Sequence, residues 1–517
     1  MICKVYNKVC SNRLYFILFI VVLTVLSSFN IFHSGIIYGD DINFHMYRIF
    51  GIVDNIKIGK YVPVYFNYLK GFGYGNGLFY PDLFLFIPAV LNYLGLNIII
   101  SLKIFIFIIN FFSIYFMYLC VYRISGEKKC AYASMILYAI SGYRLIDFVA
   151  RGALGEMIAF VFLPLVVLGL YEIFFGDYEH GYFLTIGLSC LCFSHVISFY
   201  LMCFFVILFI FINMKCLDKT RLKYLIIYIL LAMLITVHFW LPMLEQIVSD
   251  KFNFAINSKV FENIVPFNLL FFDLPFNGNL EYFPVGVGLA YYVFIFKYFR
   301  MLKKDNFIFI ILCFGLISIL FCFVDVFWKI NVFYKVFSVI QFPWRFYMFA
   351  SFFFILVVSL FIKNVHFNKL IKLLFVYLLV VFIVNISMYS INVYVNEPKK
   401  NEIMVGEYLP EGFNLNIVDD YFNDDILYER KNNVLSVSII KKDDYVEVPL
   451  IYYKGYVACG DRCYETFKTD NGLVGIYVDS DVENLDVYYY GTRIYNFTKF
   501  VSVLGIFVLI YIIKKYH

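Results

Sequence analysis

Long apolar runs alternate with short polar connections along most of the chain. A helix that crosses a bilayer needs about 20 predominantly apolar residues, and on that rule the pattern predicts about 12 membrane-spanning helices. Their approximate ranges are 14–34, 98–122, 130–147, 155–175, 181–196, 197–214, 222–241, 282–299, 306–324, 344–362, 370–392 and 497–513. The pattern therefore predicts a polytopic α-helical membrane protein.

The apolar stretch 80–94 is only about 15 residues long, which suits a re-entrant or interfacial element better than a span. If it crossed the bilayer, the connection that holds Arg123, Lys128 and Lys129 would change sides relative to the other basic connections. We therefore expect this stretch not to cross.

Basic residues gather at alternate ends of the predicted spans. They are Lys4, Lys8, Arg13, Arg123, Lys128, Lys129, Lys215, Lys219, Arg221, Lys223, Lys297, Arg300, Lys303, Lys304, Lys363, Lys369, Lys372, Lys514 and Lys515. The excess of Lys and Arg in cytoplasmic loops of membrane proteins predicts that these ends are cytoplasmic. We expect a multi-pass protein of the cell membrane whose first helix is a retained signal-anchor and whose termini are both cytoplasmic.

The segment 397–496 differs from the rest of the chain. It holds 19 Asp and Glu against 10 Lys and Arg, and apolar residues alternate with polar ones as in half-buried strands. The alternation is clearest in Val434–Ile440, Tyr445–Tyr453, Val474–Val478 and Leu485–Tyr489. It predicts a small extracytoplasmic β-sandwich. The expected division is a transmembrane domain 1–396 with a first outer loop 35–97, a β-rich domain 397–496, and a final membrane helix and tail 497–517.

Composition agrees with a membrane protein. The 517 residues are 62% hydrophobic and 15% charged, against about 25% charged residues in soluble domains. Cys459 and Cys463 lie in the predicted outer segment, where an oxidising compartment favours a disulfide across a tight turn. A free or metal-bound pair is the alternative, although no second Cys/His pair nearby completes a zinc site.

The glycine-rich run 71–77 lacks the Gly-Lys-Ser/Thr ending of a phosphate-binding loop. It is more typical of a flexible loop at the membrane surface than of a phosphate cradle. We expect neither a nucleotide nor a nucleic-acid partner.

A first cluster of candidate residues opens the first outer loop. Asp40 and Asp41 follow Gly39 as a helix start, and Asp41, His45 and Arg48 share one face of that helix. A carboxylate there can serve as a general base, with a neighbour or a bound cation that tunes it. The alternative is that the two Asp residues only cap the helix.

Further charged residues lie at the same predicted side. Arg144 and Arg151 carry guanidinium groups that suit phosphate recognition, and Glu156 suits a metal or a sugar hydroxyl. The alternative is a buried set of ion pairs that locks two helices. Arg345, in a Pro-Trp-Arg run, faces this side or serves as an interfacial anchor. His195 and His238 are interpreted as hydrogen-bonding groups in helix packing.

Several motifs together resemble a known family. They are Gly39-Asp40-Asp41 with His45 and Arg48, Lys70-Gly71-Phe72-Gly73-Tyr74-Gly75, Phe79-Tyr80-Pro81, Arg151-Gly152-Ala153 with Glu156, Gln341-Phe342-Pro343-Trp344-Arg345, Glu407-Tyr408-Leu409-Pro410 and Val448-Pro449-Leu450-Ile451-Tyr452-Tyr453-Lys454-Gly455-Tyr456. The chain resembles the bacterial membrane proteins labelled pyruvoyl-tetrahydropterin-synthase-related and the YfhO-like family. Both resemble the GT-C superfamily of polytopic glycosyltransferases. The run Cys459–Cys463 departs from the Asp-Gly turn of YfhO-like chains.

The resemblance implies a GT-C-like fold and transfer of a sugar from a polyprenyl-phosphate donor to a cell-envelope glycan, lipid or protein. It implies that Asp40 or Asp41 is the base, and that Arg144, Arg151 and Arg345 are candidates for the carrier phosphate. Glu156 would bind a metal or the substrate. The metal, Mg²⁺ or Mn²⁺, is left open, and Asp41 is a further possible ligand for it. His45 and Arg48 are candidate substrate-binding residues. Two other classes remain: a non-catalytic assembly factor for envelope polysaccharide, and a lipid or polysaccharide transporter.

Overall fold

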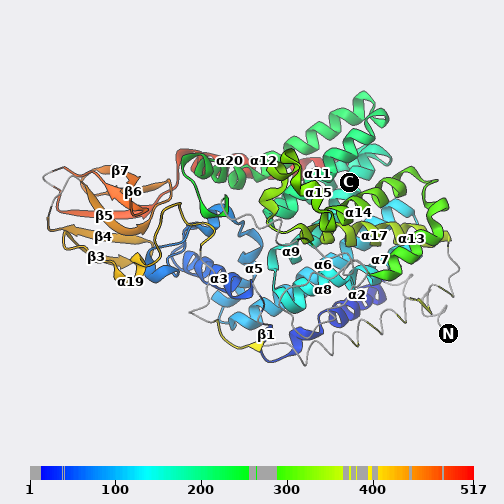
Figure 1. The fold of residues 1–517 in the computed structure, drawn as a ribbon, viewed down its shortest axis with the longest axis horizontal. Coiled ribbons are helices and arrows are strands. Elements are labelled where there is room, and N and C mark those ends of the chain that lie inside the picture. The colour runs from blue at the N-terminus through cyan, green and yellow to red at the C-terminus, as the bar shows by residue number, and fades with distance from the viewer. Residues whose placement is uncertain are drawn as a thin grey trace.

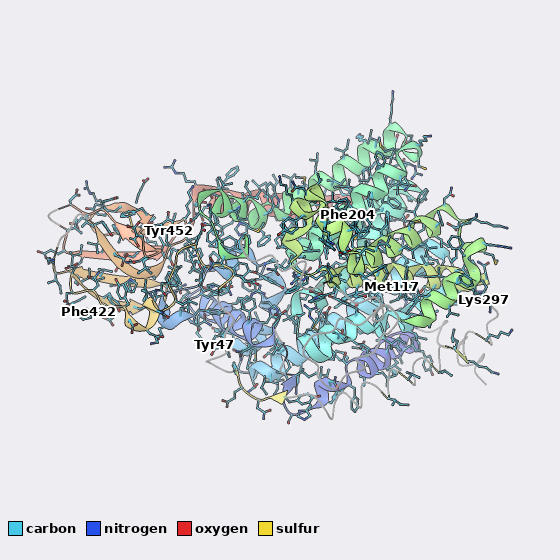
Figure 2. All side chains as sticks on the ribbon, in the orientation of Figure 1. Tyr47, Met117, Phe204, Lys297, Phe422 and Tyr452 are labelled. Carbon is cyan, nitrogen blue, oxygen red and sulfur yellow. A yellow bond between two sulfur atoms is a disulfide. The ribbon has the colours of Figure 1, made fainter. Side chains whose placement is uncertain are left out.

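The computed structural model is elongated, with a β-domain at one end and a helical body at the other (Figure 1). It describes residues 13–37, 39, 41–255, 264, 288–364, 369, 372–373, 376, 380, 383, 394–398, 406–441, 445–479 and 482–516. Phe422 and Tyr452 lie in the β-domain and Lys297 lies at the far end of the helical body (Figure 2). Most of the predicted span 370–392 is outside the described residues.

Helices form most of the described chain. They are α2 (Arg13–Ser27), α3 (Ile42–Lys57), α4 (Asn76–Phe79), α5 (Phe86–Tyr93), α6 (Ile98–Ser125), α7 (Lys128–Ala139), α8 (Gly142–Ile146), α9 (Leu154–Phe174), α10 (Tyr182–Cys192), α11 (Val196–Ile212), α12 (Lys219–Ser249), α13 (Leu289–Leu302), α14 (Asn306–Phe323), α15 (Asp325–Lys329), α16 (Asn331–Phe337), α17 (Phe346–Phe361), α19 (Ile417–Asp420) and α20 (Arg493–Tyr516).

Six helices in the described part of the chain are long and apolar enough to cross a membrane. They are α6, α9, α12, α14, the helix Pro343–Asn364 that contains α17, and α20. The expected count of about 12 is therefore not confirmed in the described part of the chain. The predicted span 130–147 divides into α7 and α8 because the chain leaves the helix at Ser141. The stretch 80–94 contains a 3-10 turn at Leu83–Leu85 and the short helix α5, together too short to cross a membrane, as the length of the stretch predicts.

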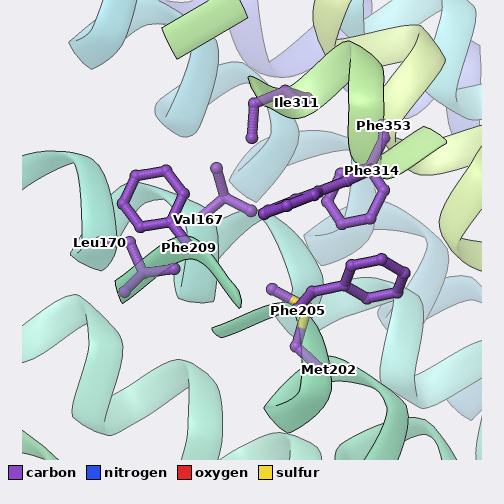
Figure 3. A pocket seen from close by; sticks show the side chains of 8 residues that line it. All are labelled: Val167, Leu170, Met202, Phe205, Phe209, Ile311, Phe314 and Phe353. Atoms are coloured by element: carbon purple, nitrogen blue, oxygen red, sulfur yellow. The ribbon is translucent and has the colours of Figure 1, made fainter. Parts of the chain in front are cut away.

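Close contacts at glycines fix the helix packing. A Cβ on Gly169 of α9 would lie 2.1 Å from the backbone of Leu184 in α10, and Gly315 of α14 is in similar contact with the ring of Phe354. Where α9, α11, α14 and α17 meet, apolar side chains leave a space of only about 10 Å³ (Figure 3). That volume is roughly what a single water needs, so this interior is packed and holds no room for a lipid chain.

Connections predicted on the same side of the membrane lie together. The Tyr224 and Tyr516 hydroxyls are 2.8 Å apart, which joins the start of α12 to the end of α20. Lys129 donates to the carbonyl of Lys363 at 2.8 Å. The opposite ends of α12 and α20 meet through Glu245 and Thr492 at 2.5 Å, so the two helices run antiparallel.

The β-domain contains one antiparallel sheet of seven strands in the order β3-β4-β9-β6-β7-β8-β5. The strands are β3 (Ile426–Lys431), β4 (Val434–Ile439), β5 (Val446–Ile451), β6 (Tyr456–Cys459), β7 (Cys463–Lys468), β8 (Leu473–Ile476) and β9 (Asn484–Tyr489). The four predicted strands are confirmed, but a single barrel-like sheet replaces the two stacked sheets of a sandwich. Cys459 and Cys463 face each other across the β6–β7 hairpin and form a disulfide.

The glycine-rich run 71–77 packs against the β-domain, whereas its composition predicts a flexible loop. A Cβ on Gly75 would lie 2.6 Å from the ring of Tyr453 in the β-domain, and the Ile451 amide donates to the Phe72 carbonyl at 2.9 Å. A second small sheet pairs β1 (Ile36–Ile37) with β2 (Tyr394–Val395). The first loop thus contacts the β-domain directly and also pairs with the strand that precedes it.

Candidate functional site

The start of α3 is fixed against the turn between α8 and α9. The Asp41 amide donates to the Arg151 carbonyl at 3.0 Å. Gly152 follows with φ +63°, and a Cβ there would lie 2.9 Å from Cβ of Ile42. Only glycine adopts this backbone without cost and leaves room for α3. The Arg-Gly-Ala motif therefore sets where Asp41 lies.

Asp41 occupies the N-cap position of α3, but its side chain makes no capping hydrogen bond. Its carboxylate acts electrostatically on Asp147 and Tyr80. For Asp41 this favours a role in the charged cluster over simple helix capping. Asp40 lies outside the described residues.

Arg48 lies on the inner face of α3 and is bound by Asp82, which precedes α5. Its guanidinium donates to Asp82 Oδ1 at 2.6 and 3.1 Å and to the Pro81 carbonyl at 2.7 Å. The side chains of Arg48 and Asp82 are 1% and 2% exposed. The hydroxyls of Tyr61 and Tyr65 donate to the other oxygen of Asp82 at 2.8 and 2.5 Å. Both carboxylate oxygens are therefore satisfied, and the first loop closes around this pair.

His45 connects that pair to the rest of the site. Arg48 donates to its Nδ1 at 3.1 Å, so the ring is a neutral acceptor at that nitrogen. Burial, and then the charges of Arg48 and His195, hold the pKa of His45 well below its usual value. His45 therefore stays uncharged at neutral pH.

Glu156 is the centre of the second group. Its Oε2 accepts hydrogen bonds from Tyr143 at 2.7 Å and Arg151 at 3.1 Å. Its Oε1 accepts one from Arg151 at 3.2 Å and lies 3.4 Å from Nε of Arg345. The first turn of α9, the turn before it and the segment before α17 therefore converge on one carboxylate.

Two charged groups in this cluster keep unused hydrogen-bonding capacity. Asp147, whose side chain is 0% exposed, accepts from Arg151 at 2.5 Å through Oδ1, while its Oδ2 has no hydrogen bond. Arg345 binds the Ile340 carbonyl and Gln341 through one terminal nitrogen, and its Nε has no hydrogen bond. Buried polar atoms without partners are costly, which marks both as candidate ligand contacts.

Tyr80 and His195 lie between the two groups. The Tyr80 ring lies 4.1 Å from the Arg48 guanidinium carbon, and its centroid is 5.9 Å from those of His45 and His195. His195 caps α11 by accepting from the Ser198 amide through Nδ1. This agrees with a hydrogen-bonding role in helix packing, and the charge of Glu156 also acts on the ring.

The structure thus brings together Asp41, His45, Arg48, Arg151, Glu156 and Arg345. Arg144 is different. Its guanidinium donates to Asn110 of α6 at 2.5 Å and to the Ala139 carbonyl at 3.1 Å, so it links α6, α7 and α8 and makes no contact with Glu156 or Arg345.

The described part of the site does not fit a divalent metal. Both oxygens of Glu156 are occupied by Arg and Tyr donors, which a cation would have to displace. Among the described residues no group of three His, Cys, Asp or Glu side chains is arranged to hold a metal ion. The chemistry below therefore uses no metal.

Sequence reasoning omitted Asp82, Tyr143 and Tyr80 from the candidate site. A signal for Asp82 existed: it is the only acidic residue between Asp54 and Glu127, and a lone acid in apolar surroundings calls for a basic partner. The two tyrosines carried no comparable signal in a chain with 46 Tyr.

Comparisons with known proteins add no assignment. No protein-family model matches the chain, and none of the curated proteins matches it.

Proposed function

We propose that the protein is a membrane glycosyltransferase of the GT-C type. It moves a sugar from a polyprenyl-phosphate donor to a cell-envelope acceptor on the side of the membrane that holds the β-domain. The observation that carries the proposal is the position of Asp41: an acidic side chain not used for capping, held by a backbone hydrogen bond beside the Arg151–Glu156–Arg345 cluster.

In this mechanism Asp41 accepts the proton of an acceptor hydroxyl. The acceptor oxygen then bonds to C1 of the donor sugar as the bond between C1 and the phosphate oxygen breaks. The electron pair leaves with polyprenyl phosphate, whose charge Arg345 stabilises through its guanidinium, in which Nε makes no hydrogen bond to the protein. Asp41 returns its proton to solvent after product release.

The remaining residues position these two groups. Glu156 fixes Arg151 and Arg345, and the Arg48–Asp82 pair fixes α3. Neutral His45 accepts from Arg48 and adds no positive charge next to the base. Arg144 serves helix packing in this scheme and is no longer a phosphate candidate.

The test compares sugar transfer by wild type, Asp41→Asn and Asp54→Asn. Asp54 lies on the same helix but is exposed and pairs with Lys57 at 3.0 Å. Loss of a general base costs about 10²–10⁴-fold in rate, so Asp41→Asn should lose that much turnover at unchanged membrane abundance, while Asp54→Asn keeps wild-type turnover. Full activity of Asp41→Asn would move the assignment to an assembly factor or a transporter, which need no ionised base.

A further inference from the structure

A groove of about 400 Å³ lies between the β-domain and the first loop. One wall is the segment after α3, with Ile58, Lys60 and Val62, and the other is formed by the β3–β4 turn and β9. The volume falls within the roughly 300–1,000 Å³ of small-ligand sites.

Both walls are fixed to each other. Asn433, in the two-residue turn between β3 and β4, donates to Asn55 of α3 at 3.3 Å. Asn55 in turn donates to the carbonyl of Val62 at 2.8 Å. The groove is therefore a built feature of the junction and not a gap between loosely placed domains.

Lysines outnumber acidic groups in the described lining of the groove. Lys60 and Lys431 line it, and neither has a carboxylate at ion-pair distance among the described residues. The charge of Lys60 also acts on that of Lys499, in α20. Asp486, the one acidic group of the described lining, accepts from the Ser436 hydroxyl at 2.7 Å.

Aromatic rings and hydroxyl groups lie at the floor of the groove. The Lys60 ammonium lies 5.7 Å from the ring centroid of Tyr488 and 5.6 Å from that of Tyr490. Ser436, Asp486 and Tyr488 share the outer face of the sheet, because the residues between them are buried. Flat rings suit the face of a sugar, and the neighbouring hydroxyl, carboxylate and amide groups suit its hydroxyls.

We propose that this groove binds an anionic glycan, with Lys60 and Lys431 on its carboxylate or phosphate groups and Tyr488 under a sugar ring. The groove adjoins the candidate active site: Tyr61, next to Lys60, donates to Asp82, which binds Arg48. That the glycan is the acceptor of the transfer rests on the proposed function, whereas the binding itself does not.

The experiment measures binding of trigalacturonate and of neutral maltotriose to the full protein in neutral-lipid nanodiscs at low salt. Wild type should bind trigalacturonate, and Lys60→Gln with Lys431→Gln should weaken that binding by about tenfold or more, through loss of two charge-assisted contacts. Lys57→Gln is the matched control, because this lysine is nearby and exposed but pairs with Asp54 outside the groove. Its affinity should equal that of wild type.

A phosphate trisaccharide in place of the uronate identifies which anion is preferred. Equal affinity of the double variant and wild type would overturn the proposal, as would wild-type binding to phosphatidylglycerol vesicles but to neither glycan. Asp41→Asn should retain trigalacturonate binding. A protein that binds the glycan but transfers no sugar would therefore contradict the proposed function and leave the groove assignment standing.

Discussion

Arg48 and Asp82 are buried together although 34 residues separate them in the chain. Neither charge has access to water, so each depends on the other and on the tyrosines around them. Taking one partner away leaves an uncompensated buried charge, which costs far more than the pair contributes.

Asp82→Asn should therefore destabilise the protein by about 3–5 kcal/mol, measured as a fall in the free energy of unfolding in detergent. The double variant Arg48→Gln with Asp82→Asn removes both charges and should recover part of that loss. Asp54→Asn, at the exposed pair with Lys57, should keep wild-type stability. Equal stability of the single and double variants would contradict a buried ion pair.

His45 predicts a dependence of stability on pH. Its pKa is lowered in the folded state by burial and by Arg48, so the unfolded chain binds a proton that the folded protein excludes. The stabilisation is present above the unfolded pKa of 6.5 and is lost as pH falls below it. Each pH unit below that value costs about 1.4 kcal/mol.

Lowering the pH from about 7.5 to about 5.5 should thus destabilise wild type by about 1.4 kcal/mol more than His45→Gln. Thermal unfolding of both proteins at the two pH values measures the difference. The same acid response in both would mean that His45 is not held neutral.

Single residues also show where sequence patterns lose information. Spacing along a helix put Asp41, His45 and Arg48 on one face. It could not predict the contact with Asp82, because Asp82 belongs to another element. Arg144 and Arg151 looked equivalent in sequence, and their different partners depend on the π-turn at Asp147–Arg151 that separates them.

At the scale of elements, the contact between Gly152 and Ile42 is what aligns α3 with α9. Gly126, which ends α6, has a similar φ of +70° but no atom within 4 Å of the position of a Cβ. Substitutions at the two glycines therefore separate the cost of the left-handed backbone from the effect of pushing a neighbouring residue aside.

Gly152→Ala should lower transfer activity by at least about tenfold, because it moves Asp41 relative to the cluster. Gly126→Ala carries only the left-handed backbone cost of about 1–2 kcal/mol and should keep its turnover per folded molecule. Activity and melting temperature of the two variants give the comparison. Equal activity would show that the contact does not position the site.

Element prediction from sequence worked where one physical rule dominates. Alternation predicted β4 and β9, in which buried residues alternate with exposed or half-buried ones. It also predicted β5 and β8, which the structure buries at nearly every position, while β7 was missed because its residues are only exposed or half-buried. Apolar runs predicted where helices lie, but not that the run 130–147 would break at Ser141 or that α10 would end at Cys192, before a membrane length was reached.

At the scale of the molecule, the candidate site, the groove and the disulfide all lie toward the β-domain end. The predicted topology puts that end outside the cell. The free, exposed Cys216, in the basic connection before α12, belongs to the opposite side in that topology.

Labelling with a membrane-impermeant maleimide tests this arrangement. Cys459 and Cys463 should react in intact cells only after an impermeant reductant opens their disulfide, because the predicted topology places the β-domain outside. Cys216 should react only after the membrane is permeabilised. Labelling of Cys216 in intact cells would reverse the topology.

The most direct test of the central claim is release of polyprenyl phosphate by the purified protein in native lipids, from a panel of polyprenyl-phosphate sugars offered with envelope acceptors. The account predicts release from one donor, dependent on an acceptor. No release from any donor by folded protein would contradict the transferase assignment.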